Sequence, residues 1–355
     1  MMKSTATTPP VGTTSAGSAT AATRRNVVKG GLAALAVGAA GLGRVTSAQA
    51  QTKMVLKASD VHPLGYPTVE SVLRMGKKLD AATNGRLTIQ MFPSMQLGGE
   101  KEAIEQAQVG ALQIARISVG AVGPVVDDVN VFNMPFVFRD AKHMETVLDG
   151  DIGNELLAKI TANEKTGLVA LGWMNAGSRN IYNSKHPIKV LADLKGLKIR
   201  MIGNPLFIDT MNALGGNGIA MGFDQVYSAM QTGVVDGAEN NLPSFVSQNH
   251  YQVAKYFSMT EHLIIPELLV FSKTSWDKLS KDDQALIRKL GREAQAEQRV
   301  LWYEAEKVAL AKMKEVGTEV VLQLDKKPFQ DAVKPVWEKY GAKYADMTKR
   351  IAAVS

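Results

Sequence analysis

The sequence predicts an α/β fold, and two features of its central region lead to that prediction. Residues 197–201 are a short apolar run of the kind that forms strands, and residues 234–241 predict a second strand that ends in polar groups. Helical patterns lie between them, at 205–213 and 224–232, and each is followed by glycine. Alternating strands and helices are typical of α/β sheets, and 355 residues leave room for two such domains.

Both central strands end in polar side chains. Arg200 lies near the end of the first strand and Asn240 near the end of the second. A guanidinium cannot lose its charge and is rarely buried alone, so Arg200 either reaches solvent or faces an anion. Ligands of open α/β sheets bind beyond the carboxyl ends of the strands. A planar two-pronged donor suits a carboxylate, and an asparagine both donates and accepts, so these ends predict an acid-binding site.

The composition is that of a soluble globular protein, with 45% hydrophobic and 21% charged residues. The chain has no cysteine, which excludes disulfides, thiolate metal sites and a cysteine nucleophile. Much of the formal net charge of +7 comes from the first fifty residues, which have no acid and five bases: Lys3, Arg24, Arg25, Lys29 and Arg44. The remainder has no run of basic residues with interleaved aromatics, so nucleic acid is not an expected partner.

Residues 1–50 are expected to be an export signal that is removed. Residues 1–22 are a low-complexity tail, and Arg24-Arg25 stands in a segment that resembles the twin-arginine export motif, with Val27 where a Phe is usual. The apolar run 30–43 is too short to span a bilayer comfortably, although an uncleaved anchor is an alternative. Residues 48–50 (AQA) fit a cleavage site, so the mature chain is expected to start near Gln51.

The first part of the mature chain continues the alternation of strands and helices. Apolar runs predict strands at 53–58, 87–92, 111–118 and 167–174. Helices, several of them bounded by proline or glycine, are predicted at 67–83, 100–109, 141–148 and 152–165. The apolar run 131–138 contains Pro135 and is not expected to be a central strand.

Two charged residues in this part allow two interpretations each. Arg116 interrupts the apolar strand 111–118, where a charge is costly unless paired, so it forms either a structural ion pair or a ligand contact. Glu100 opens the helix 100–109, where the helix dipole favours a carboxylate. Either that helix-start role or a ligand contact explains Glu100.

The last part of the chain contains a predicted strand at 268–272 and a helical pattern at 281–316, which forms either one long helix or two abutting helices because Gly291 weakens it. At 1.5 Å per residue such a helix would be about 50 Å long, enough to lie across two domains. A final helical segment is expected at 327–351.

Three long segments resemble the solute-binding proteins of TRAP transporters, the DctP-type family: NMPFVFRD, DLKGLKIR and GFDQVYSAMQTGVVDGAENN. The resemblance extends over roughly 53–344. It implies a two-lobed periplasmic binding protein fold with a ligand cleft and a long helix spanning both lobes. Lobe I is expected to hold 51–176 and 266–305, and lobe II 177–265 and 306–355. Such a protein is a periplasmic monomer without a cofactor that hands an organic acid to sodium-driven TRAP membrane subunits.

The resemblance also implies roles for four residues of lobe II. Arg200 corresponds to the arginine that fixes the ligand carboxylate, and Arg179 to a second arginine that contacts it. Asn240 matches the asparagine that follows the DGxE element. Phe223 matches the aromatic residue that closes over the ligand, although a lone Phe before a helix is more often part of the core.

His62, Glu100 and Arg116 are the polar candidates of lobe I. Together they resemble relatives that bind sugar acids such as glucuronate and galacturonate, whose hydroxyls need many donors and acceptors. A C4-dicarboxylate or another oxo or hydroxy acid is the alternative ligand, but a dicarboxylate would need more cations. Ser118 stands where the sialic-acid branch has Glu, and residues 203–205 (GNP) differ from many uronate binders.

Other classes fit the sequence less well. An exported uronate-processing enzyme is not favoured, because the chain lacks cysteine, a GxSxG motif and a recognised catalytic pair; a general base such as His62 with Glu100 would be the alternative. A binding protein of the ABC or tripartite tricarboxylate systems would share the export signal and the two domains, but the long helix and the DGAEN element argue against it.

No metal site is expected. His143, His186 and His250 are predicted on surface segments. The adjacent pair Glu261-His262 lacks the i, i+4 spacing of a helical zinc site.

Overall fold

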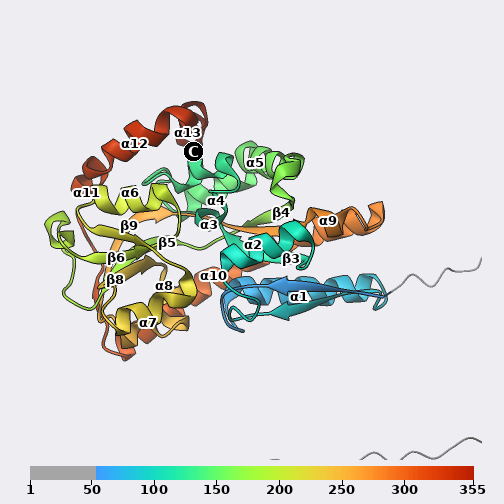
Figure 1. The fold of residues 1–355 in the computed structure, drawn as a ribbon, viewed down its shortest axis with the longest axis horizontal. Helices are drawn as coiled ribbons and strands as arrows, with labels where there is room; N and C mark the ends of the chain where they lie inside the picture. Colours follow the sequence, from blue (N-terminus) through green and yellow to red (C-terminus); the bar gives the residue numbers. More distant parts are fainter. Residues whose placement is uncertain (1–52) are drawn as a thin grey trace, which may run out of the picture. The chain divides into compact units, whose positions relative to one another are not determined.

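The computed structural model describes residues 53–355, so the predicted export signal lies outside the described residues. The described residues form two β-sheets with helices packed around them, which confirms the predicted α/β class (Figure 1). Within 53–355, no helix is long and apolar enough to cross a membrane.

The first sheet has the strand order β2-β1-β3-β10-β4. Strand β1 pairs in parallel with β2 and β3, whereas β10 is antiparallel to β3 and β4. The strands are β1 (Met54–Ser59), β2 (Leu87–Phe92), β3 (Ile114–Ser118), β4 (Leu168–Met174) and β10 (Glu267–Ser272). The helices associated with this sheet are α1 (Pro67–Ala82), α2 (Glu100–Val109), α3 (Val119–Val122), α4 (Ala141–Asp149), α5 (Asp151–Ala162) and α9 (Lys273–Trp276). Strands β3, β4 and β10 are buried along their whole length, which explains why they are mostly apolar.

The second sheet has the order β11-β9-β5-β8-β6-β7. Its strands are β5 (Ser178–Asn183), β6 (Lys198–Met201), β7 (Asn217–Ala220), β8 (Gly237–Asn240), β9 (Tyr256–Ile264) and β11 (Glu319–Val321). Its helices are α6 (Pro205–Ala213), α7 (Val226–Gln231) and α8 (Leu242–Ser247). Asparagine side chains cap two of these helices, Asn204 on α6 and Asn241 on α8, each accepting from a backbone N–H of the first turn.

Helix α10 (Lys281–Glu315) is one uninterrupted helix of 35 residues that packs on both sheets (Figure 1). Near its middle, Gln295 Oε1 accepts a hydrogen bond of 2.9 Å from the Trp173 N–H of β4. Further along, Ala309 and Met313 belong to the core of the second sheet. Gly291 does not break the helix. A Cβ at this position would approach Leu171 Cβ to 3.0 Å, so glycine allows the helix to pack closely on β4.

The chain passes between the sheets at two further places. It leaves the first sheet after β4, enters the second at β5, and returns from β9 to β10. Gly177 lies in the first crossing with φ +60°, and a Cβ on it would come within 2.5 Å of Glu306 Oε1. The positive φ therefore favours glycine there, whereas the end of the Glu306 side chain could move aside.

The C-terminal segment forms three helices instead of one: α11 (Lys327–Ala332), α12 (Lys334–Tyr340) and α13 (Ala345–Ala353). Helix α13 packs on α5, where Arg350 pairs with Glu155 at 2.8 Å. The same region corrects one prediction, because His143 is buried and its Nε2 donates to Ile351 O. The surface prediction for His250 is also wrong, since it is buried with Nδ1 2.7 Å from the Tyr182 hydroxyl.

Candidate functional site

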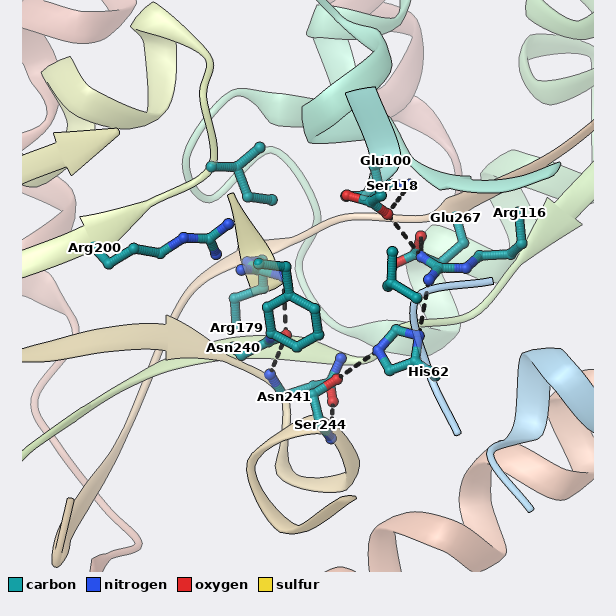
Figure 2. Close-up of a pocket in the computed structure, with 13 residues that line it drawn as sticks. His62, Glu100, Arg116, Ser118, Arg179, Arg200, Asn240, Asn241, Ser244 and Glu267 are labelled. Carbon is teal, nitrogen blue, oxygen red and sulfur yellow. Dashed lines mark hydrogen bonds and ion pairs between the residues drawn. The ribbon is translucent and has the colours of Figure 1, made fainter. Parts of the chain in front are cut away.

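One narrow cavity lies between the two sheets, beyond the carboxyl ends of β3, β6 and β8. Its volume is about 310 Å³, including space that is open to solvent. This is where α/β sheets bind ligands. The lining residues come from both sheets: Val61, His62, Glu100, Arg116, Ser118, Arg179, Arg200, Ile202, Phe223, Asn240, Asn241, Ser244 and Glu267 (Figure 2). All seven residues predicted from the sequence are among them.

On the side of the first sheet, Arg116 is surrounded by three carboxylates. Its Nη1 donates to Glu100 Oε1 at 2.9 Å and to Glu267 Oε2 at 2.5 Å. Its Nη2 lies 2.6 Å from Asp60 Oδ1 and 2.8 Å from His62 Nδ1. Each terminal nitrogen of Arg116 therefore already has two protein partners, and the ion-pair interpretation of this residue is the one seen here.

The carboxylates of this cluster respond differently to burial. Burial opposes ionisation of Asp60, but the Arg116 charge and the His62 contact hold the pKa of Asp60 below its usual range. Burial, together with the nearby Glu100 and Asp60 charges, raises the pKa of Glu267 to about 7 despite Arg116. Glu267 is thus the member of the cluster that titrates near neutral pH.

Glu100 takes the helix-start position and makes two contacts within the protein. It is the first residue of α2, as the helix-start interpretation requires. Its Oε1 accepts from Arg116 and also from the Ser118 backbone N–H at 2.8 Å. No protein hydrogen bond to Glu100 Oε2 is present within 53–355, so this oxygen is available at the cavity wall.

His62 connects the two sides of the cavity. Its Nδ1 lies 3.0 Å from Asp60 Oδ1. Figure 2 shows its other contact, in which Nε2 lies 3.1 Å from Ser244 Oγ of α8. Its ring stacks on Tyr66 with centroids 3.7 Å apart. Burial and then the Arg116 charge lower the pKa of His62, so the ring is neutral at pH 7. Both ring nitrogens are occupied by protein partners, so His62 holds the two sides together.

A second contact also joins the two sides. Asn204 Nδ2 donates to Gly120 O at 3.1 Å and to Asn130 Oδ1 at 3.0 Å. Asn204 belongs to the GNP loop that departs from many uronate binders, and it lies next to the cavity residue Ile202. Asn204, in the loop where the sequence differs from many uronate binders, therefore both joins the two sides of the cavity and caps α6.

On the side of the second sheet, Arg179 is tied to Glu239. Its Nε and Nη2 donate to the two carboxylate oxygens of Glu239, and Nη2 also donates to Glu239 O at 2.8 Å. Its Nη1 donates to Asn240 Oδ1 at 3.0 Å. Burial opposes the charge on Arg179, but Glu239 more than offsets this and raises the pKa of Arg179. Only Nη1 of Arg179 retains capacity for a ligand.

Arg200 differs from the other two arginines because no carboxylate contacts it. Its Nε donates to Met221 O at 2.8 Å, and no ion pair of Arg200 occurs within residues 53–355. Its side chain is buried, and burial followed by the Arg179 charge lowers the pKa of Arg200. In Figure 2 the guanidinium points into the cavity, towards the side that holds Arg116 and Glu267. A buried cation without an anion is costly, so the cavity is suited to an anionic ligand.

The remaining lining is partly apolar. Phe223 is half-buried just before α7, and Arg200 Cζ lies 5.8 Å from its ring centroid. Val61 and Ile202 complete this surface. Phe223 therefore faces the cavity and also packs against the core of the second sheet.

The sequence did not single out Glu267, Asn241 or Ser244 as site residues. Glu267 follows Pro266 at the start of an apolar strand, the same signal of a charge within a buried run that drew attention to Arg116. Asn241 and Ser244 form the cap of α8, a local pattern that gives no indication of a cavity.

The site shows no metal-binding arrangement. Within the described part of the chain, no group of three or more histidine, aspartate or glutamate side chains could hold a metal ion. His262 and Glu239 come within 3.9 Å, but both lie beside the Arg179 charge, and burial and that charge lower the pKa of His262 to about 3.

Comparison with solved structures places this cavity in a known group of proteins. A TRAP periplasmic solute binding protein from Pseudomonas putida F1, solved with D-glucuronate, is 56% identical with a TM-score of 0.83, over 85% of this chain and 98% of that one. A protein from Bradyrhizobium sp. BTAi1, in complex with galacturonate, is 45% identical with a TM-score of 0.81, over 84% of this chain and 99% of that one.

The protein from Citrobacter koseri has been solved in two states. With bound D-glucuronate it matches at 48% identity and a TM-score of 0.83, over 85% of this chain and 100% of that one. In its apo, open structure the TM-score falls to 0.74 at 46% identity, over 84% and 98%. The present chain is therefore arranged more like the ligand-bound state.

The family model for bacterial extracellular solute-binding protein, family 7 (DctP), matches residues 58–343. This range contains every strand of both sheets except the first part of β1, all of α12 and every residue that lines the cavity. The chain therefore belongs to the DctP family and is a solute-binding protein of the TRAP type.

Proposed function

We propose that this protein captures a hexuronate, such as glucuronate or galacturonate, and delivers it to the membrane subunits of a TRAP transporter. The observation that carries the proposal is the pairing of one buried cation without an anion, Arg200, with an acceptor-rich wall on the opposite side. The relatives solved with D-glucuronate and galacturonate support the same class of ligand.

In this proposal the ligand carboxylate binds Arg200, which offers both Nη groups. Arg179 contributes through Nη1 alone, because Glu239 holds its other nitrogens. Asn240 keeps its Oδ1 on Arg179 and the Asn241 N–H, so its Nδ2 is the group directed to the ligand. The hydroxyls of the sugar face Glu100, Glu267 and Ser118, and Phe223 covers the ring.

Binding closes the two lobes, which we propose to comprise 51–176 with 266–305 and 177–265 with 306–355. The hinge includes the two crossings around Gly177 and between β9 and β10. Closure follows because contacts from both lobes to one ligand exist only in the closed state. Helix α13 also contacts α5, so the C-terminal segment bridges both lobes.

We propose that the protein acts by binding without turnover, in the periplasm, after export by the twin-arginine route and removal of residues 1–50. It needs no cofactor and works as a monomer. His62, the one candidate base, is occupied on both nitrogens by Asp60 and Ser244, which supports a binding role over acid–base chemistry.

A thermal-shift screen tests the proposal with hexuronates, aldonates, C4-dicarboxylates and 2-oxoacids. Glucuronate or galacturonate is expected to raise Tm by several degrees and to be recovered unchanged, as expected for a ligand bound only by the native state. A shift with succinate or malate alone would favour the C4-dicarboxylate alternative. Conversion of the ligand would favour the enzyme.

A further inference from the structure

The two walls of the cavity carry opposite net charge. On the wall of the second sheet, Glu239 balances Arg179, which leaves the positive charge of Arg200. On the wall of the first sheet, Asp60, Glu100 and Glu267 surround the single charge of Arg116. Even with Glu267 protonated, the wall of the first sheet keeps a net negative charge. His62 is neutral and does not change this charge.

Arg116, the cation of the first wall, has no terminal nitrogen left for a ligand. Arg116 has two protein partners on each terminal nitrogen, and its Nε is buried away from solvent without a partner. An anionic group that reaches this wall would therefore meet no available guanidinium. It would instead approach the two carboxylates that line the cavity, Glu100 and Glu267.

The same wall is well suited to hydroxyl groups. Within residues 53–355, no hydrogen bond is made to Glu267 Oε1 or to Glu100 Oε2. A carboxylate oxygen accepts an O–H readily but repels a second carboxylate, and unpaired like charges in a buried site are strongly disfavoured.

We propose that Glu267, together with Glu100, is a specificity-determining residue that accepts ligand hydroxyls and excludes a second carboxylate. The site then takes a sugar acid with one carboxylate and rejects the aldaric diacid of the same carbon skeleton. This inference rests on the proposed hexuronate function and adds a limit to it. The same two residues would also disfavour C4-dicarboxylates, because the second carboxylate of such a ligand, at the end away from Arg200, is repelled whatever the length of the ligand.

The test compares D-glucuronate with D-glucarate, in which C1 is oxidised to a carboxylate. Dissociation constants are measured by calorimetry at pH 8 for the wild-type protein, Glu267→Gln and Glu319→Gln. Glu319→Gln is the control, because it removes the same charge at an exposed position on β11, away from the cavity. The wild type is expected to bind glucarate at least about 100-fold more weakly than glucuronate.

Glu267→Gln is expected to lower the ratio of the glucarate to the glucuronate dissociation constant by about tenfold, because one repelling charge is removed. Glu319→Gln is expected to leave this ratio unchanged. Glu100→Gln, at the more exposed edge of the cluster, is expected to narrow it too and serves if Glu267→Gln does not fold. Equal wild-type affinity for both sugars would overturn the inference but leave the hexuronate function standing. An unchanged ratio in both folded Gln variants would also overturn it. Binding of neither sugar would refute the proposed function itself.

Discussion

Arg179 and Glu239 form a buried bidentate ion pair, and this pair distinguishes Arg179 from Arg200. Arg179 lies on β5 and Arg200 on β6, with β8 between them in the second sheet, and both line the cavity. One carries its counter-charge within the protein, whereas the other has none among residues 53–355. The two residues therefore differ in what their removal does to stability and to binding.

Replacing Arg200 with Met is expected to abolish most binding without destabilising the protein. Loss of one partner of a buried charge pair costs about 3–5 kcal/mol, which corresponds to roughly two to three decades in Kd. The ligand-free protein loses only a buried cation and the hydrogen bond to Met221 O, so its free energy of unfolding is not expected to fall. Calorimetry with glucuronate and urea denaturation measure the two effects. A loss of affinity below threefold would exclude Arg200 as the carboxylate anchor.

Replacing Arg179 with Met is expected to have the opposite main effect. It leaves the Glu239 carboxylate buried and unpaired, which lowers the free energy of unfolding by about 3–5 kcal/mol. Urea denaturation of the ligand-free protein measures this loss.

The double variant Arg179→Met/Glu239→Leu is the control. It removes both charges and is expected to recover a large part of the stability. If the double variant is as unstable as the single one, the cost lies in packing and the ion-pair explanation fails.

Local signals predicted much of the fold. The strand 87–92 and the helices 100–109 and 205–213 have the predicted bounds, because proline, glycine and apolar spacing act within each segment. Strand β9 was not predicted, since its buried face carries Ser258, Thr260 and His262. Ser258 Oγ accepts a hydrogen bond from the Ile188 N–H, which is distant in sequence, Thr260 contacts His262 Nδ1 on the same strand, and His262 Nε2 has no hydrogen-bond partner within residues 53–355.

For the candidate site, too, the local sequence predicted some residues, whereas contacts distant in sequence could not be predicted. Isolated charges in apolar strands pointed to Arg116 and Arg200, since an apolar run makes a charge conspicuous. What balances each charge could not be predicted: Glu267 pairs with Arg116 across 151 positions of the chain. His62 illustrates the limit most clearly. Its residue type suggested a ligand contact, but its partner Ser244 comes from the other side of the cavity.

Replacing Ser244 with Ala is expected to shift the ligand-free protein towards the open state. Ser244 Oγ lies 3.1 Å from His62 Nε2 and 2.9 Å from Tyr66 Oη, and these contacts join the two sides of the cavity. Leaving buried polar groups unpaired costs about 1–3 kcal/mol, so affinity for glucuronate is expected to fall by about tenfold. Small-angle scattering of the ligand-free protein reports the larger radius of gyration of the open state.

Ser247→Ala on the same helix is the matched control, because Ser247 Oγ bonds only to the Ser244 carbonyl. Equal scattering curves for Ser244→Ala and Ser247→Ala would show that the contact with His62 does not hold the lobes together.

The titration of Glu267 is expected to make stability depend on pH in a direction that the sign of its shift fixes. Its pKa rises from 4.5 to about 7 on folding, so the native state binds more protons between these values. The stabilising contribution is present below about pH 4.5 and is lost as the pH rises through 7. The free energy of unfolding of the wild type, relative to Glu267→Gln, should therefore fall by up to about 3 kcal/mol over this range.

The comparison with Glu267→Gln is essential because three buried histidines oppose this trend. His62, His250 and His262 have lowered pKa values, so their contribution to stability rises with pH up to about 6.5. They are present in both proteins and cancel in the difference, which urea denaturation between pH 5 and pH 8 measures. Parallel stability curves would mean that Glu267 stays ionised throughout. Arg116 would then outweigh the burial of Glu267, and the first wall of the cavity would keep its full negative charge at every pH tested.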